Sequence, residues 1–290
     1  MGVRLLSSAS QRIIDFRSRP AFLAEFYGST PGTAGHETAK WLNRRTGSHD
    51  DSHFQRSFTL DGYLAEIRAS GITQAVLVGR DTPGLSIANE RIAELTADHP
   101  ELIGFGSVDP QSQGAAQAVA SVEHSIRVLG QKAINLEPGF GSPPLHADDP
   151  LLHPVYEACQ ELGVPVCLMS GPTTPDLAYN DPAAVGRVAR AFPRLNIVCY
   201  HGFWPRVNEI VGVAFRYQNV YLCPDMYLFA PGSQAYVEAA SGVLQDQFLF
   251  GTSYPFRAMR QTVDDFIGLG WPEPVLDKLL FGNAQRLLQR

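Results

Sequence analysis

The chain has 290 residues, of which 44% are hydrophobic, and this is enough to bury a large core in one domain. Its 23 basic and 29 acidic residues give a net charge of −6, which argues against a nucleic-acid partner or an anionic membrane surface, because both need clustered lysine and arginine. No apolar run approaches the length of a membrane span, and residues 1–10 lack the apolar core of a signal peptide, so we expect a cytoplasmic protein. The four cysteines are singly spaced and are expected to be buried thiols in a reducing compartment.

The first predicted strand begins the segment 12–20, which reads Arg-Ile-Ile-Asp-Phe-Arg-Ser-Arg-Pro. Pro20 ends the strand, so Arg17 and Arg19 lie at its C-terminal end. A guanidinium group stays charged at neutral pH and is poorly suited to a dry core. Each arginine therefore needs solvent, a carboxylate partner or an anionic ligand, and the sequence leaves these alternatives open.

Helices and strands alternate along the rest of the chain. A polar segment over residues 21–57 shows no regular apolar period, and we predict that it is an insertion that covers the site as a lid. The predicted helices span 59–69, 86–98, 115–129, 152–162, 182–191, 207–217 and 233–244, and the last ones lie within 273–290. The predicted strands that follow the first span 75–79, 102–107, 132–136, 164–169, 196–200, 220–223 and 248–251. Short continuous apolar strands in this alternation predict an α/β fold, a (β/α)8 TIM barrel, in a single domain over 1–290.

Enzymes with this fold place their chemistry on the loops that follow the strands, so the strand ends are the positions to inspect. They carry Arg17, Arg19, Arg80, Asp109, Glu137, Met169, Ser170, His201, Asp225, Ser253 and Tyr254. This set is rich in arginine and carboxylate.

Several short motifs occur in a recognisable order along nearly the whole chain. They are Ile-Ile-Asp at 13–15, Gly-Phe-Gly-Ser-Val-Asp-Pro at 104–110, Asp-Asp-Pro at 148–150, Pro-Val-Tyr-Glu-Ala at 154–158, Gly-Val-Pro-Val at 163–166, His-Gly at 201–202, Phe-Gly-Thr-Ser-Tyr-Pro at 250–255 and Gly-Asn-Ala at 282–284. In these motifs the chain resembles the amidohydrolase-related barrels, which include aminocarboxymuconate semialdehyde decarboxylase, resorcylate decarboxylases and a dicarboxylate lactonase. The resemblance implies an enzyme and a homodimer, and it is a weak guide to the substrate.

The metal site of that family is where this sequence departs. The family's usual His-x-His falls on Arg17 and Arg19, its fifth-strand histidine on Met169 and its eighth-strand aspartate on Ser253, so that only His201 remains. A catalytic divalent ion needs about three nitrogen or oxygen ligands and an open position, and two fixed positive charges repel it. We therefore predict no metal in the usual pocket and no other cofactor.

The remaining candidates have acid–base or binding roles. His201 is a candidate general acid or base, because imidazole titrates near neutral pH. Asp225 orients that imidazole, acts as a second acid–base group or pairs with an arginine. Glu137 is either a further acid–base group or the counter-ion of the arginines. Ser253 is expected to donate a hydrogen bond rather than act as a nucleophile. The predicted substrate-binding residues are Arg17, Arg19, Arg80, Met169, Ser170, Trp204, Tyr227, Ser253 and Tyr254, with Phe256 as a further candidate for the pocket wall.

Together these residues predict a metal-independent hydrolase acting on a small carboxylated, cyclic or aromatic substrate. Hydrolysis ranks first because a base alone can activate water, whereas the decarboxylases of the family resemble one another in using a metal. A carboxy-lyase that releases carbon dioxide is the second alternative, and a barrel that binds a ligand without catalysis is the third.

Overall fold

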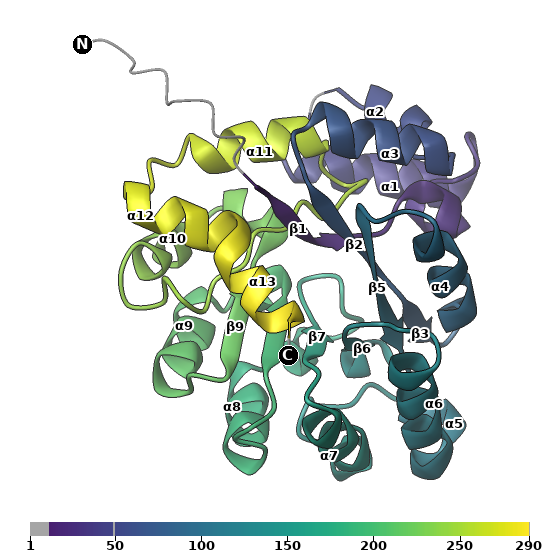
Figure 1. Cartoon of the computed structure of the whole chain (residues 1–290), viewed down its shortest axis with the longest axis vertical. Coiled ribbons are helices and arrows are strands. Elements are labelled where there is room, and N and C mark those ends of the chain that lie inside the picture. The colour runs from purple at the N-terminus through teal and green to yellow at the C-terminus, as the bar shows by residue number, and fades with distance from the viewer. Residues whose placement is uncertain (1–11, 49, 290) are drawn as a thin grey trace.

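The computed structural model describes residues 12–48 and 50–289, and its centre is a barrel of parallel strands (Figure 1). The strands follow one another in the sheet in the order β1 (Ile14–Ser18), β2 (Gln74–Val78), β5 (Leu102–Ser107), β6 (Ile134–Leu136), β7 (Val166–Met169), β8 (Ile197–Tyr200) and β9 (Val220–Cys223). Every neighbouring pair is parallel. The predicted α/β barrel is therefore confirmed.

The eighth predicted strand is a short connection rather than a regular strand. Residues 247–254 close the gap between β9 and β1 through single bridges, one of which joins Leu222 to Phe248. On the other side the Ser253 N–H donates to the Arg17 carbonyl over 2.9 Å. The end of this segment is thereby fixed beside the end of β1.

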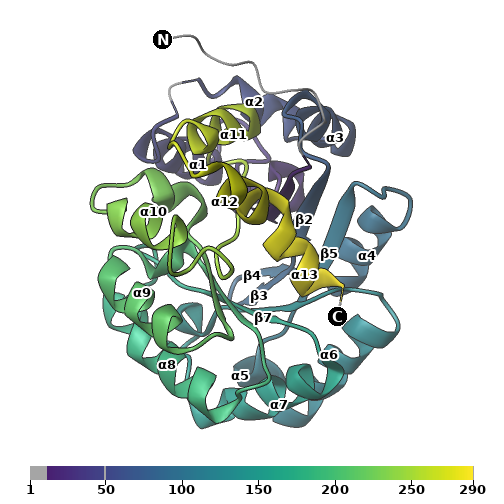
Figure 2. The same ribbon diagram turned by 60° about the vertical axis from the view of Figure 1, so that its left-hand side comes forward.

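Helices surround the barrel, and a helix near the C-terminus lies across one end of it (Figure 2). The surrounding helices are α3 (Leu60–Ala69), α4 (Asn89–Ala97), α5 (Pro110–Gln113), α6 (Ala115–Arg127), α7 (His153–Leu162), α8 (Pro182–Ala191), α9 (Val207–Arg216), α10 (Gln234–Ala240), α11 (Met259–Ile267) and α12 (Glu273–Asp277). After a π-helical turn over Lys278–Gly282 comes α13 (Asn283–Leu288). Ala284 and Leu287 of α13 pack with Ile14 and Phe16 inside the barrel, so the opposite, C-terminal end of the strands is the one left for a ligand.

Strand β8 shows how alternation builds two apolar layers. Val198 and Tyr200 belong to the cluster inside the barrel, whereas Ile197 and Cys199 pack in the cluster between barrel and helices. Side chains of successive strand residues point to opposite faces, so one strand serves both layers. The four cysteines are buried and free, as predicted.

Three parts of the chain differ from the elements expected from sequence. The polar segment 21–57 forms helices: two 3-10 turns, Ala21–Leu23 and Glu25–Tyr27, then α1 (Ala34–Arg45) and α2 (Ser52–Arg56). Helix α1 buries only a narrow stripe, in which Asn43 donates to the Phe256 carbonyl over 2.9 Å, so its apolar period is weak. A hairpin of β3 (Arg80–Thr82) and β4 (Leu85–Ile87) replaces the start of the helix predicted at 86–98, and α11 was not predicted.

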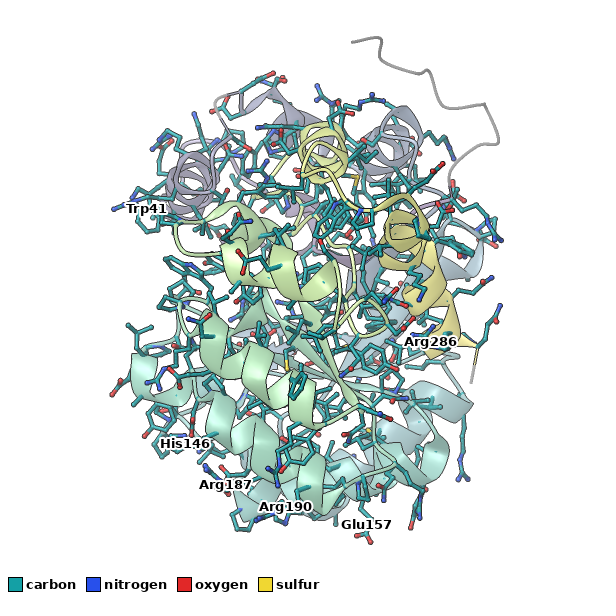
Figure 3. All side chains as sticks on the ribbon, turned by 90° about the vertical axis from the view of Figure 1, so that its left-hand side faces the viewer. Trp41, His146, Glu157, Arg187, Arg190 and Arg286 are labelled. Atoms are coloured by element: carbon teal, nitrogen blue, oxygen red, sulfur yellow. The ribbon has the colours of Figure 1, made fainter. Side chains whose placement is uncertain are left out.

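Charged side chains cover the outside of the helix layer. Figure 3 shows Glu157, Arg187 and Arg190 pointing outward from α7 and α8. Asp149 accepts a hydrogen bond from the Leu151 N–H and so caps the 3-10 turn Pro150–Leu152 that precedes α7. Within residues 12–48 and 50–289, no helix is both long and apolar enough to cross a membrane.

A buried carboxyl group, Asp15 on β1, ties the closing segment to the barrel. Its Oδ1 accepts from the Thr252 N–H over 2.8 Å and from the Arg17 N–H over 3.1 Å, and its Oδ2 lies 2.6 Å from the Thr252 hydroxyl. Burial raises the pKa of Asp15 to about 7, although these hydrogen bonds and the Arg17 charge oppose the rise. The protonated carboxyl therefore stabilises the fold more than the ionised one does.

Replacing Asp15 with asparagine is expected to remove a pH dependence of stability. Because the folded pKa lies above the ordinary value of 3.8, the stabilisation by Asp15 is complete below about pH 4 and is lost as the pH rises toward 7. An amide keeps the geometry of the protonated acid and cannot ionise. In urea unfolding, the stability of D15N relative to the wild type should thus increase between pH 4 and pH 8, by on the order of 3 kcal/mol in the free energy of unfolding at pH 8. Parallel pH profiles for the two proteins would contradict this assignment.

Candidate active site at the strand ends

The backbone is left-handed at three successive strand ends. His201 follows β8, Asp225 follows β9 and Ser253 ends the closing segment, with φ values of 59°, 47° and 59°. In the part of the chain that the structure describes, Phe203 is the only other non-glycine residue with positive φ. Such conformations cost roughly 1–3 kcal/mol each and persist where the surroundings enforce them, often at functional sites. Three predicted site residues therefore share an unusual backbone.

His201 and Asp225 form a buried pair. The Nδ1 of His201 lies 2.8 Å from Asp225 Oδ1, and the His201 backbone N–H donates to Oδ2 over 3.1 Å. Because a carboxylate accepts, Nδ1 carries the proton and Nε2 keeps its lone pair. Burial, together with the charges of Arg17 and Arg19, lowers the pKa of His201 in spite of Asp225. The imidazole is therefore a neutral base at pH 7, and Asp225 orients it.

Arg19 is fully engaged by protein groups. Its Nη2 donates to Glu137 Oε1 over 2.5 Å and to the Gly79 carbonyl over 2.8 Å, and its Nε donates to the Val78 carbonyl over 3.0 Å. Glu137 Oε2 lies 3.1 Å from Arg80 Nε. Burial alone would raise the pKa of Glu137, but Arg19 and Arg80 outweigh it and hold this pKa below its usual value. The geometry thus favours Glu137 as a counter-ion of two arginines rather than as an acid–base group.

Arg17 is in a different situation, although its side chain is only 2% exposed. Its Nη2 donates to the thioether sulfur of Met169 over 3.1 Å, and within residues 12–48 and 50–289 no carboxylate lies within 4.0 Å of it and its Nε has no hydrogen-bond partner. The same sulfur accepts from Arg19 Nη1 over 3.5 Å. A thioether is a weak acceptor, so this buried cation lacks the compensation that burial of a charge requires. An anionic ligand would supply it.

Aromatic side chains line the pair on one side. The Tyr227 ring meets the His201 ring edge-on with centroids 5.2 Å apart, and it stacks on Trp204 at 5.3 Å with an interplanar angle of 2°. Beneath Arg17, the guanidinium carbon lies 5.3 Å from the centre of the Tyr200 ring. The candidate wall residues Trp204 and Tyr227 are therefore brought to the pair.

Other predicted site residues point elsewhere. Tyr254 lies in the layer between barrel and helices, where its hydroxyl donates to the His53 carbonyl over 3.0 Å and its ring packs on Tyr63. Ser170 turns toward the Tyr179 carbonyl, 3.5 Å away. A side chain at a strand end points inward or outward according to the strand's alternation, so the substrate contacts of these two residues stay predictions.

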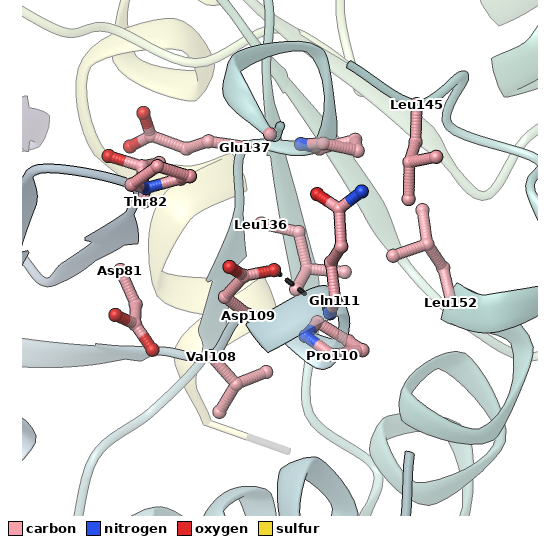
Figure 4. Close-up of a pocket in the computed structure, with 13 residues that line it drawn as sticks. Asp81, Thr82, Val108, Asp109, Pro110, Gln111, Leu136, Glu137, Leu145 and Leu152 are labelled. Carbon is pink, nitrogen blue, oxygen red and sulfur yellow. Dashed lines mark hydrogen bonds between the residues drawn. The ribbon is translucent and has the colours of Figure 1, made fainter. Parts of the chain in front are cut away.

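Asp109, a further strand-end residue, caps α5 by accepting from the Gln111 N–H over 3.0 Å. A cavity of about 10 Å³, roughly the room of one water molecule, lies beside it. Figure 4 shows Glu137, Asp81 and Asp109 among the side chains that line this cavity. Its size sets it apart from a substrate site.

Sequence reasoning missed the aromatic cover over the arginines. The Tyr27 ring centre lies 5.9 Å from the Arg19 guanidinium carbon, and the Tyr27 hydroxyl accepts from Arg80 Nη1 over 3.4 Å. The rings of Phe26 and Phe140 each lie 5.1 Å from the Arg80 guanidinium carbon. The adjacent aromatic pair Phe26–Tyr27 in an otherwise polar segment was the available signal. That the segment 21–57 acts as a lid stays a prediction.

This barrel is similar to known proteins in both sequence and structure. The family model described as Amidohydrolase matches residues 43–290. The chain belongs to this family. The solved structure of a TIM-barrel protein from Bordetella bronchiseptica is 36% identical to this amidohydrolase-family chain, covers 96% of it and 98% of its own length, and gives a TM-score of 0.88. A search of curated proteins found no match.

Decarboxylases share the fold at lower identity. The 5-carboxyvanillate decarboxylase from Sphingomonas paucimobilis is 19% identical, with 96% of this chain and 99% of that chain covered and a TM-score of 0.66. A dihydroxybenzoic acid decarboxylase from Polaromonas, solved with bound manganese, is also 19% identical, with 96% of each chain covered and a TM-score of 0.66. At these identities the likeness is one of fold.

The residues of this amidohydrolase-family chain do not fit a divalent ion at the family's position. Among the described residues, no three His, Cys, Asp or Glu side chains are grouped so that they would hold a metal. Arg17 and Arg19 both donate to the Met169 sulfur there, and the single imidazole of His201 uses one nitrogen for Asp225. Two guanidinium groups and a thioether are the wrong donors for manganese or zinc.

Proposed function

We propose that this amidohydrolase-family chain is a carboxy-lyase that releases carbon dioxide from a small planar carboxylate bearing a neighbouring hydroxyl group, without a resident metal. The observation that carries this proposal is Arg17, a buried guanidinium with no carboxylate partner in the described chain, next to a buried His–Asp pair. Fixed positive charge would stabilise an oxygen that becomes negative during the reaction.

The proton movement in this proposal uses one base. Neutral Nε2 of His201 removes the proton of the substrate hydroxyl, and the resulting oxyanion lies against Arg17. The imidazolium returns that proton to the carbon that bears the carboxylate. The bond from that carbon to the carboxylate then breaks, its electron pair stays on the ring, and carbon dioxide leaves. A hydroxybenzoate thus yields carbon dioxide and a phenolate, which takes a proton from water, and no oxidant or reductant is needed.

Hydrolysis of a lactone or ester is the second candidate, and the neutral His201 base favours it. In that reaction Nε2 would take a proton from water, the hydroxide would attack the carbonyl carbon, and Arg17 would stabilise the tetrahedral oxyanion. Sequence reasoning ranked hydrolysis first. The order is reversed here because decarboxylases of hydroxylated aromatic acids occur among the proteins with this fold.

A product assay on the purified full-length protein would separate the two reactions. Hydroxybenzoates labelled with ¹³C in the carboxyl group are expected to yield ¹³CO₂ by mass spectrometry, with unchanged rate in EDTA and less than stoichiometric metal by elemental analysis. H201N serves as the blank. Acid release from lactones without ¹³CO₂ would support hydrolysis, and loss of activity in EDTA that manganese restores would contradict the metal-independent mechanism.

A further inference from the structure

Three buried polar atoms around the pair are left without partners, and all three are able to donate a hydrogen bond. They are Nε of Arg17, the hydroxyl of Ser253 and the hydroxyl of Tyr227, none of which has a hydrogen-bond partner in the described part of the chain. The three side chains are 2%, 0% and 5% exposed. Buried polar groups are nearly always paired in native proteins, so three unpaired donors in one region need an explanation.

Backbone geometry holds these residues together. Ser253 donates its N–H to the Arg17 carbonyl over 2.9 Å, which fixes the two strand ends side by side. At Gly251 a Cβ atom would lie 2.8 Å from the Cys223 sulfur, 3.1 Å from the Arg17 Cβ and 3.4 Å from the Asp225 Cβ, so only glycine lets this backbone pass close to all three. The Tyr227 ring lies 5.2 Å from the His201 ring. Burial and then the charge of Asp225 raise the Tyr227 pKa, against the smaller opposing effect of Arg17. The phenol therefore stays protonated as a donor.

Ser253 has a strained backbone. Its φ of 59° suits glycine, and a Cβ in this region is strained. A serine that is strained, fully buried and without a hydrogen bond to its hydroxyl stabilises the fold less than glycine would at this position.

We propose that Arg17, Ser253 and Tyr227 form a three-donor oxyanion site, which binds one oxygen of a phenolate or enolate. This inference rests on the proposed function and deepens it, because it names the substrate oxygen that the protein stabilises. Three donors match the lone pairs of a single anionic oxygen, and the one guanidinium selects the anion over the neutral phenol. The acceptor atom is the oxygen that gains charge, whereas the departing carboxylate loses charge and gains nothing from such a site.

Binding of 4-nitrophenol tests this site without any turnover. Its anion absorbs at longer wavelength than the phenol, so titration reports the protonation state of the bound molecule. The wild type is expected to bind the anion at least tenfold more tightly than the phenol. Y227F and S253A should each lose about tenfold in anion affinity, a typical effect of one hydrogen bond to a charged group, and R17M should lose the preference for the anion.

The Ser253 pair of variants separates function from folding. S253G relieves the backbone strain and is expected to unfold at a higher temperature than the wild type, yet to bind nitrophenolate as weakly as S253A. Full anion affinity in S253A, S253G and Y227F would overturn the three-donor site. If these variants lose anion affinity while no carboxylate substrate is turned over by the wild type, the proposed reaction fails and the oxyanion site stands.

Discussion

Replacing Arg17 with methionine is expected to lower kcat/KM by about 10³-fold and, at the same time, to stabilise the fold. The loss of activity follows because one positioned donor to a developing oxyanion contributes about 10²–10³-fold in rate, and here the donor is also charged. The gain in stability follows because the variant removes a buried cation whose hydrogen bond goes to a thioether. We expect the free energy of unfolding to rise by on the order of 1 kcal/mol. Steady-state kinetics and urea unfolding measure the two effects.

Arg19 provides the matched control for Arg17. It contacts the same sulfur of Met169, but it is paired with Glu137 and with two backbone carbonyls. R19M would leave a buried carboxylate with half its compensation, so the expected cost is about 3–5 kcal/mol. Opposite signs of the stability change in R17M and R19M are the signature of one ligand-binding and one structural arginine. A destabilised R17M with normal kcat/KM would refute the role of Arg17.

The second large effect is expected at the His201–Asp225 pair. D225N keeps the shape of the side chain but removes the carboxylate that accepts from Nδ1, so the imidazole loses its orienting partner. We expect kcat to fall by about 10²–10⁴-fold, the usual contribution of a positioned acid–base group. The kcat of H201N should fall by a similar factor. The kcat of the double variant should be little lower than that of either single variant, because the effects of residues that act as a unit are not additive.

The pH profile checks the same pair independently. Burial lowers the pKa of His201 below 6.5, so the base stays neutral on moderate acidification. The rate is therefore expected to hold from pH 8 through pH 6.5 and to fall only at the lower folded pKa of His201. A half-maximal rate above pH 6.5, or a D225N variant with wild-type kcat, would show that the proton moves by another group.

The arrangement of charge explains why one arginine is available and its neighbour is not. Glu137 lies between Arg19 and Arg80, and Asp225 is held by His201, so both buried carboxylates of the site are occupied. The remaining guanidinium, that of Arg17, keeps a net positive field at the strand ends. This field favours an anionic oxygen, and it adds to burial, the main cause, in lowering the pKa of His201.

Much of the fold and of the site was determined by the sequence itself. Short apolar runs alternating with helices predicted a parallel barrel, because strands that are buried on both faces must be apolar throughout. The polar residues that interrupt those runs at strand ends predicted His201, Asp225, Arg17 and Arg19 as neighbours, because the carboxyl ends of all barrel strands lie at one rim. The helical content of segment 21–57 was missed, because α1 buries too narrow a stripe to produce a period.

Only the tertiary structure decided which role each of these residues has. The sequence presents Arg17 and Arg19 as equals two positions apart, and it cannot tell that Glu137, more than a hundred residues away, reaches one and not the other. Nor can it tell that the Ser253 hydroxyl is left without a partner in the described chain while Tyr254 turns outward to His53. Composition and the spacing of apolar residues indicate which groups are buried. The pairing of those groups depends on distances of a few ångströms between segments far apart in the sequence, and those distances are set only when the barrel closes.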